Sequence, residues 1–199
     1  MTVTYADALT VRKTEYDVDP LIVRRWSPRA MSGESLTVDE LMTLFDAARW
    51  APSSYNEQEW RFLYATRAGG HWPAFFELLV EGNRTWCDKA GVLVVVTAAT
   101  HFTRTGKPNP VFAFDAGAAF QNLALQGARM GLVVHGMAGF DSERARATLS
   151  VPETHAVLAM IAIGRPGHAA DLPEPLRALE QPSLRKPIGE IAREGRFAF

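Results

Sequence analysis

A long and nearly uniformly apolar segment, Phe112 to Met130, limits the possible folds of this chain more than any other feature. Small and larger apolar residues alternate along it, and the polar residues form only a narrow stripe: Asp115, Asn122, Gln126 and Arg129. A helix that is apolar on most sides is buried on most sides. Two arrangements satisfy this equally well, namely a central core helix within one subunit or a helix that packs closely against a second subunit.

Composition indicates one globular domain. The chain has 199 residues, of which 47% are hydrophobic, and we expect a single domain over 1–199. The formal net charge is -1, which creates no global field that would attract nucleic acid or an anionic membrane. We therefore expect neither as a partner.

Cysteine content and hydropathy indicate the compartment. Cys87 is the only cysteine, so the chain can form neither an intramolecular disulfide nor a tetrathiolate zinc site. Met1 to Tyr16 lacks the pattern of a secretory signal, and the longest apolar run, Gly91 to Ala99, is too short to cross a bilayer. We expect a cytoplasmic protein.

Hydrophobic periodicity and turn residues predict several helices and strands. Helices are expected over Val38–Trp50, with Thr37 and Glu40 as a capping box, and over Trp72–Glu81, Phe112–Met130 and Ser142–Leu149. Strands are expected over Trp60–Thr66, Gly91–Ala98 and Thr154–Ile163, and a short extended piece after Gly131. Residues 168–183 appear irregular, and the tail from Arg185 could add a strand. This order predicts an α+β or α/β domain.

No residue pattern supplies an evident catalytic group or metal site. The histidines are scattered: His71, His101, His135, His155 and His168. The chain also lacks the nucleophile elbow of hydrolases and the glycine pattern of phosphate-binding loops. A cofactor that supplies its own chemistry is therefore favoured over a catalytic residue of the chain.

Four segments carry ligand-binding potential. The stretch from Ala51 to Phe62 combines hydroxyls and amides, which donate and accept hydrogen bonds, although a polar turn would use the same residues. Arg24 to Arg29 is rich in guanidinium groups, which suit phosphate, although a solvated basic turn is the simpler alternative. Leu184 to Pro187 is again basic, and Gly131 to Asp141 contains glycines that allow close approach of the backbone to a flat ligand.

Taken together and in this order, the segments RRWSPRAM, AARWAPSSYNEQEWRF, GLVVHGMAGFD and RKPIGE resemble the FMN-dependent nitroreductase family. The resemblance extends from about Val23 to Pro187. It implies an α+β sandwich with a central mixed or antiparallel sheet flanked by helices. It further implies a homodimer whose subunits interlock, with a C-terminal arm, from about 184 to 199, wrapped around the partner.

The resemblance also implies FMN-binding residues. The phosphate and ribityl side of FMN would contact Arg25, Trp26 (mainly through its backbone), Ser27, Arg29 and Arg185. A loop that reaches the flavin, partly from the partner subunit, would contribute Pro52, Ser53, Ser54, Asn56 and Gln58. The edge of the isoalloxazine ring would meet the backbone of Gly136, Met137, Ala138 and Gly139.

The implied activity is the reduction of electron-poor acceptors, such as nitroaromatics or quinones, by NAD(P)H in a ping-pong sequence. The flavin carries the chemistry, so no side chain is assigned a catalytic role and no metal is expected. One alternative is a flavin-binding or flavin-sequestering protein without turnover. A cofactor-free dimeric scaffold that has kept the fold is another.

The chain departs from the family pattern at two positions. Glu59 stands where the family usually has proline, and Ala138 stands where some relatives carry an acidic residue. The Glu59 carboxylate would either face the ligand cleft or point into solvent. His135 precedes the flavin-facing residues, and we expect it to be packed against the protein instead of acting as a proton donor.

Overall fold

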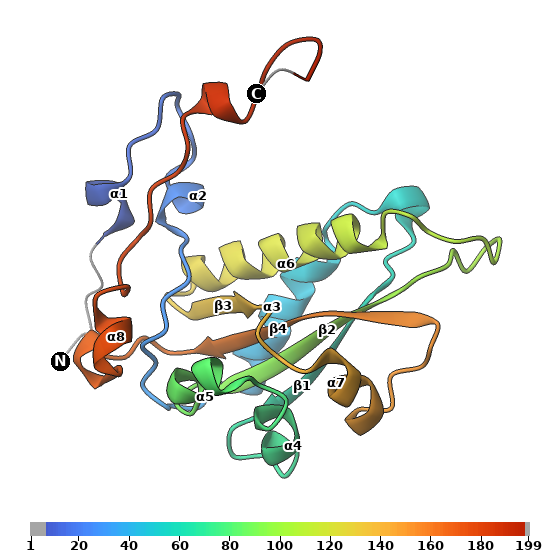
Figure 1. Ribbon diagram of the computed structural model, residues 1–199, viewed down its shortest axis with the longest axis horizontal. Helices are drawn as coiled ribbons and strands as arrows, with labels where there is room; N and C mark the ends of the chain where they lie inside the picture. The colour runs from blue at the N-terminus through green and yellow to red at the C-terminus, as the bar shows by residue number, and fades with distance from the viewer. Residues whose placement is uncertain (1–6, 198–199) are drawn as a thin grey trace.

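The structure, a computed structural model, describes residues 7–197 (Figure 1). Its centre is an antiparallel sheet with the strand order β1-β2-β4-β3. The strands are β1 (Trp60–Thr66), β2 (Val92–Ala99), β3 (Val133–Met137) and β4 (His155–Gly164). Helices cover both faces of the sheet, so the predicted α+β sandwich is confirmed.

The central strand β2 is buried on both faces. Leu93 and Val95 belong to one core, and Val92, Val94 and Val96 belong to the other. Successive side chains of a strand point to opposite faces, so an uninterrupted apolar run is what a doubly covered strand requires. The run that the sequence analysis identified as a buried strand therefore separates the two cores.

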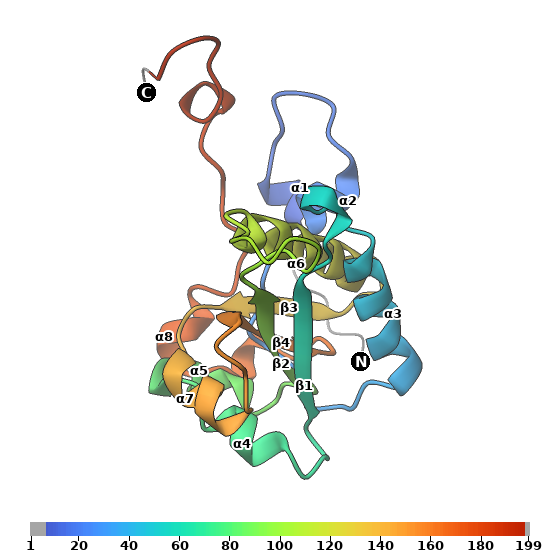
Figure 2. The ribbon, with the colours of Figure 1, turned by 90° about the vertical axis from the view of Figure 1, so that its right-hand side faces the viewer.

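One face of the sheet is covered by α3 (Val38–Arg49) and α6 (Phe112–Arg129), as Figures 1 and 2 show. The predicted capping box of α3 is present, with the Glu40 amide donating to Thr37 Oγ1 at 3.1 Å and the Thr37 amide donating to Glu40 Oε2 at 2.8 Å. Gly127 brings α6 close to β3, because a Cβ added there would lie 2.4 Å from Cγ2 of Val134.

The other face is covered by α4 (Trp72–Phe76), α5 (Glu81–Cys87) and α7 (Ser142–Thr148). The predicted single helix over Trp72–Glu81 is wrong. Leu79 instead forms a bridge with Phe140, and the Val80 amide donates to the Gly139 carbonyl at 3.1 Å. These long-range backbone bonds interrupt the helix, and a second helix begins at Glu81.

The remaining elements are short and peripheral. They are α1 (Ala8–Val11), α2 (Pro20–Arg24), η1 (Ser54–Asn56), η2 (Ala169–Asp171), α8 (Glu174–Arg177) and η3 (Ile188–Glu190). The tail forms no strand within the described residues; it extends away from the body of the molecule (Figures 1 and 2). Residues 1–6 of the segment tested for a signal peptide lie outside the described part. Within that part, no helix has the length and hydropathy needed to span a membrane.

Helix α6 is a core helix on one side only. Its inner side is buried in the core through Ala116, Ala119, Leu123, Ala124 and Gly127. Its outer side is exposed and is apolar over the first turns, where Phe114 is 80% exposed beside Ala113 and Gly117; Gln121 and Arg129 are exposed further along. Asp115, expected in the polar stripe, is only 5% exposed, so that part of the stripe faces the protein.

Glu59 lies beneath the surface, and both alternatives for its carboxylate are wrong. The residue is 1% exposed, and Asn109 Nδ2 donates to its Oε1 at 2.7 Å, whereas Oε2 has no partner among the described residues. The Asp115 carboxylate is nearby and accepts a hydrogen bond from the Ser54 amide at 2.8 Å. Burial, followed by the proximity of Asp115, raises the pKa of Glu59.

Because the carboxyl groups of Glu59 and Asp115 are buried close together, the free energy of unfolding should depend on pH. Folding raises the pKa of Glu59 above its ordinary value of 4.5, so protonation of Glu59 favours the folded state. This contribution to stability is complete below pH 4.5. It is lost as the pH rises through the raised pKa. Glu59→Gln keeps the acceptor for Asn109 and adds a donor without charge. We expect the variant to exceed the wild type in stability at pH 8 by about 1–3 kcal/mol and to match it near pH 4.

Thermal melts of both proteins between pH 4 and pH 8 check this expectation. Glu153→Gln is the matched control, because Glu153 is exposed and the charge change is the same. Parallel pH profiles of stability for Glu59→Gln and the wild type would contradict a raised pKa of Glu59 in the folded state.

Candidate functional site

Guanidinium groups from both ends of the chain gather around one cleft. We call it the guanidinium cleft; its volume is about 340 Å³, and it is lined by Arg12, Arg25, Trp26, Ser27, Arg29, His135, Leu179, Gln181, Ser183 and Arg185. The N-terminal segment with α2 and the C-terminal arm run side by side here (Figure 1), joined by the hydrogen bond from Arg12 Nε to the Ser183 carbonyl at 2.9 Å. The fold therefore unites the predicted basic segments around Arg25 and Arg185.

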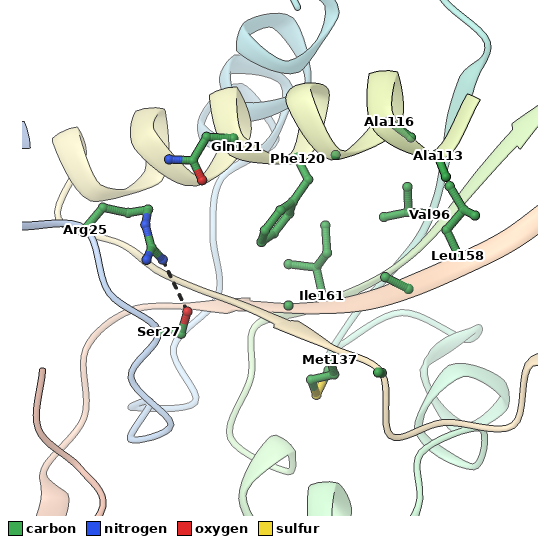
Figure 3. A pocket seen from close by; sticks show the side chains of 14 residues that line it. Arg25, Ser27, Val96, Ala113, Ala116, Phe120, Gln121, Met137, Leu158 and Ile161 are labelled. Carbon is green, nitrogen blue, oxygen red and sulfur yellow. Dashed lines mark hydrogen bonds between the residues drawn. The ribbon is translucent and has the colours of Figure 1, made fainter. Parts of the chain in front are cut away.

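Hydrogen bonds to hydroxyl groups hold two guanidiniums of the cleft, and backbone hydrogen bonds hold the turn beside it. Arg25 Nη1 donates to Ser27 Oγ at 3.3 Å (Figure 3), and Arg185 Nη1 donates to Ser183 Oγ at 2.9 Å. The nearby carboxylate of Glu180 accepts from the backbone amides of Arg29 and Ala30, at distances from 2.8 to 3.0 Å. Glu180 thus shapes the turn that carries Arg29.

The cleft concentrates positive charge, although the Glu180 carboxylate lies at the backbone of Arg29. No carboxylate within residues 7–197 forms an ion pair with Arg12, Arg25, Arg29 or Arg185. Burial, followed by the neighbouring Arg185, lowers the pKa of Arg25. An anion in the cleft would relieve this repulsion, and guanidinium forks match the oxygens of a phosphate.

His135 is packed, as expected. Its Nδ1 lies 2.9 Å from the carbonyl oxygen of Pro28, and its ring centroid lies 4.7 Å from that of Trp86. Burial is the main cause that lowers its pKa, and Arg29 and Arg25 add to the effect. The imidazole is therefore neutral at neutral pH and forms part of the wall of the cleft.

A second and more apolar cavity adjoins the first, and the two share Arg25 and Ser27. This apolar cavity has a volume of about 550 Å³ and lies between α6 and the strands β3 and β4 (Figure 3). Its other lining residues are Val96, Ala113, Ala116, Gly117, Phe120, Gln121, Gly136, Met137, Ala138, Leu158, Ala159 and Ile161. Together the cavities suit a flat apolar ligand with an anionic end.

Part of the glycine-containing segment Gly131 to Asp141 lines the apolar cavity. Gly136, Met137 and Ala138 line it. A Cβ added at Gly136 would lie 2.9 Å from Cζ of Phe120, so this glycine allows the ring of Phe120 to pack against β3. Gly139 lies outside the cavity, where its carbonyl accepts from Asn83 Nδ2 at 2.9 Å.

The loop over residues 52–58 lines neither cavity of its own chain, although it contacts the first turn of α6, which lines the apolar cavity through Ala113 and Ala116. It is held at the first turn of α6 by the hydrogen bond from the Ser54 amide to Asp115, whereas α2 lies near the other end of that helix (Figure 1). Pro52, Ser53, Ser54, Asn56 and Gln58 line neither the guanidinium cleft nor the apolar cavity.

The backbone of this loop is strained. Tyr55, Asn56 and Gln58 have φ angles of 54°, 55° and 51°, in the left-handed region that side chains other than glycine seldom adopt. The Gln58 amide donates to Ser53 Oγ at 3.0 Å, which holds the turn. Clustered strain of this kind persists only where surrounding structure enforces it, and it is frequent at functional sites.

Residues outside the predicted set also line the cavities. Arg12, Gln181 and Ser183 border the guanidinium cleft, and Phe120 and Gln121 border the apolar cavity. None of them stands in a recognisable motif, and only the fold brings Arg12 to Ser183. No group of at least three His, Cys, Asp or Glu side chains within the described residues is arranged to hold a metal ion.

Comparison with known proteins identifies relatives over the whole chain. The model of the nitroreductase family matches residues 22–81 and 70–165. A solved structure described as an oxidoreductase containing FMN is 42% identical, with 98% of this chain and 99% of that chain covered and a TM-score of 0.92. A putative nitroreductase in complex with FMN from Desulfovibrio desulfuricans is 25% identical, with 93% and 100% covered and a TM-score of 0.70.

A relative of unassigned function extends the comparison. An uncharacterised 15.4 kDa protein of Mycolicibacterium smegmatis is 34% identical over 122 residues, which is 60% of this chain and 80% of the relative. The match to the family model covers the sheet and the helices α3 to α7 that pack on it, while the likeness to the FMN-containing structure extends over both chain ends. The chain belongs to the nitroreductase family of oxidoreductases.

Proposed function

We propose that this protein is an FMN-dependent oxidoreductase that uses NAD(P)H to reduce electron-poor acceptors, such as nitroaromatics or quinones, in a ping-pong sequence. The observation that carries the proposal is the contiguity of a guanidinium cleft without counter-charge and an apolar cavity, which share Arg25 and Ser27. When bound, FMN supplies hydride transfer at its N5 atom. The cytoplasm, where reduced nicotinamide nucleotides are available, is the proposed compartment.

The residues of the chain fit FMN by their chemistry. The phosphate would lie among the guanidiniums of Arg25, Arg29 and Arg185, and the hydroxyl of Ser27 would serve the ribityl side. The ring would lie in the apolar cavity, along Gly136, Met137 and Ala138. Apolar walls exclude water from a reacting ring, and the nearby backbone offers fixed dipoles to charge that develops there.

A homodimer would complete the site. The outer side of α6 is apolar, with Phe114 exposed and Ala113 and Gly117 beside it. The arm likewise exposes Leu184, Ile191 and Phe197, at 69%, 61% and 90%. Exposed apolar surface of this extent favours an interface. In the proposed dimer the 52–58 loop of one subunit reaches the FMN of the other.

The proposed function predicts a yellow protein with turnover. The purified protein should show flavin absorbance, and the flavin released by heat should have the mass of FMN, not of FAD. It should oxidise NADH or NADPH in the presence of a quinone or nitroaromatic acceptor. Bound FMN without steady-state turnover would favour a flavin-sequestering protein, and a colourless protein that also fails to take up added FMN would contradict both functions.

The dimer predicts a constant mass on dilution. Light scattering should give twice the chain mass, 2 × 21.9 kDa, across the concentration range in which the protein stays folded. Large apolar interfaces often leave no stably folded monomer, so dissociation should coincide with unfolding and with loss of FMN. A folded monomer that retains FMN would contradict the shared site.

Arg185→Ala should weaken FMN binding and leave the fold intact. A phosphate-facing guanidinium contributes roughly 1.5–3 kcal/mol, so the dissociation constant should rise about tenfold to a hundredfold. Lys186→Ala is the control, because this neighbouring cation is exposed and pairs with Glu190 at 3.7 Å. Titration of the apo-protein with FMN measures both variants. An unchanged constant for Arg185→Ala would remove Arg185 from the site.

A further inference from the structure

Arg12 joins the two chain ends that border the guanidinium cleft. Its Nη1 donates to the carbonyls of Val23 and Arg25 at 2.8 and 2.9 Å, and its Nε donates to the carbonyl of Ser183 at 2.9 Å. The side chain is 9% exposed, although arginine is seldom buried without a partner charge. Arg12 also lies outside the residues matched by the family model, which begin at 22.

The contacts of Arg12 are all to backbone carbonyls, and none is to a carboxylate. Its Nη2 atom is buried without a hydrogen-bond partner in the described part of the chain. An unsatisfied buried donor costs about 1–3 kcal/mol, and more when the group is charged. A single guanidinium therefore fastens two segments while its own charge stays uncompensated, in a cleft that already contains Arg25 and Arg185.

The two fastened segments carry the groups that face the cleft. The carbonyl of Arg25 belongs to the residue whose guanidinium contacts Ser27, and Ser183 precedes Arg185 by two positions. A second contact ties the arm to the N-terminal segment, since the Ile188 amide donates to Glu15 Oε1 at 2.9 Å. Loss of Arg12 would leave this part of the arm held only on either side, by the contacts of Glu180 before it and of Ile188 beyond it, and would free Arg185 relative to Arg25.

We propose that Arg12 is the positioning residue of the anion site, and that the dianionic phosphate of the bound ligand supplies the missing counter-charge. The inference rests on the proposed function, because the phosphate of FMN is taken as that anion. Nη2 is inaccessible to water in this structure, so Arg12 acts through Arg25, Ser183 and the electrostatic potential of the cleft without contacting the phosphate. Ligand binding and ordering of the arm are therefore coupled.

The decisive comparison uses FMN and riboflavin, which differ by the phosphate alone. In Arg12→Met the dissociation constant for FMN should rise about tenfold or more, whereas that for riboflavin should change less than about twofold. Arg24→Met is the matched control, since it removes a neighbouring exposed guanidinium that pairs with Asp7 at 3.5 Å and does not line the cleft. This control should bind both flavins as the wild type does.

Hydrogen exchange supplies a readout that a merely structural role would not change. FMN should slow exchange of the amides over residues 183–188 in the wild type and in Arg24→Met, but not in Arg12→Met. If Arg12→Met does not fold, Arg12→Lys takes its place: the ammonium keeps the charge but cannot hold three carbonyls in a planar fork, and ligand-induced protection of the arm should again be lost. Equal losses of FMN and riboflavin affinity, or no loss of either, would overturn the proposal.

A further experiment distinguishes failure of the proposed function from failure of the proposed role of Arg12. A wild type that binds neither flavin contradicts that function, and inorganic phosphate then becomes the probe at constant ionic strength. Phosphate should slow exchange over residues 183–188 in the wild type and not in Arg12→Met. Absence of that difference would overturn the role of Arg12 whatever the natural ligand is.

Discussion

Burial of β2 on both faces is the constraint on which the rest of the structure depends. Its valines and leucine alternate between two cores, so each face needs its own layer of helices. α3 and α6 supply one layer, and α4, α5 and α7 supply the other. The antiparallel neighbour β4 pairs from Val92 to Ala99, with one irregularity of register between Val96 and Thr97, and β1 pairs from Val92 to Ala98. Placement of α6 against this sheet creates the apolar cavity.

α6 connects packing with function because it cannot bury its whole apolar surface in one chain. Its inner side completes the core around β2, and Gly127 permits the close approach to β3. Its outer side, with Phe114, remains exposed beside the apolar cavity. Hydrophobic burial is the main driving force for association, so the same surface that would hold two subunits together would also enclose the ligand.

Patterns that depend on neighbours in sequence were predictable. β1 spans Trp60–Thr66 as expected, and the capping box of α3 and the Asp141 cap of α7 are present because each uses residues within one turn. The family resemblance implied that Arg25 and Arg185 bind the same side of one ligand, and the fold brings both residues to one cleft.

Features that depend on long-range contacts were missed. The helix expected over Trp72–Glu81 is divided by backbone bonds to residues 139 and 140, which no local pattern reveals. Glu59 was assigned to a surface because it follows a polar turn, yet Asn109 and Asp115 enclose it from distant parts of the chain. Arg12 stands in no motif, and its partner Ser183 is separated from it by almost the full length of the chain.

Several locally unfavourable features of the chain lie beside the candidate site, although the left-handed φ of Ser150 and the unpartnered Nε of Arg84 belong to neither cavity. Left-handed backbone occurs at Tyr55, Asn56 and Gln58, and the loop that carries them is tied through Ser54 to Asp115, which with Glu59 forms a buried pair of carboxyl groups. At the other end of α6, guanidiniums gather without counter-charge. Each feature costs free energy, and a stable core can sustain such costs where a ligand or partner offsets them. A loop that is held in this way would need little rearrangement to meet a ligand or partner, whereas the arm beside the cleft would become ordered as the phosphate binds, at a cost in affinity.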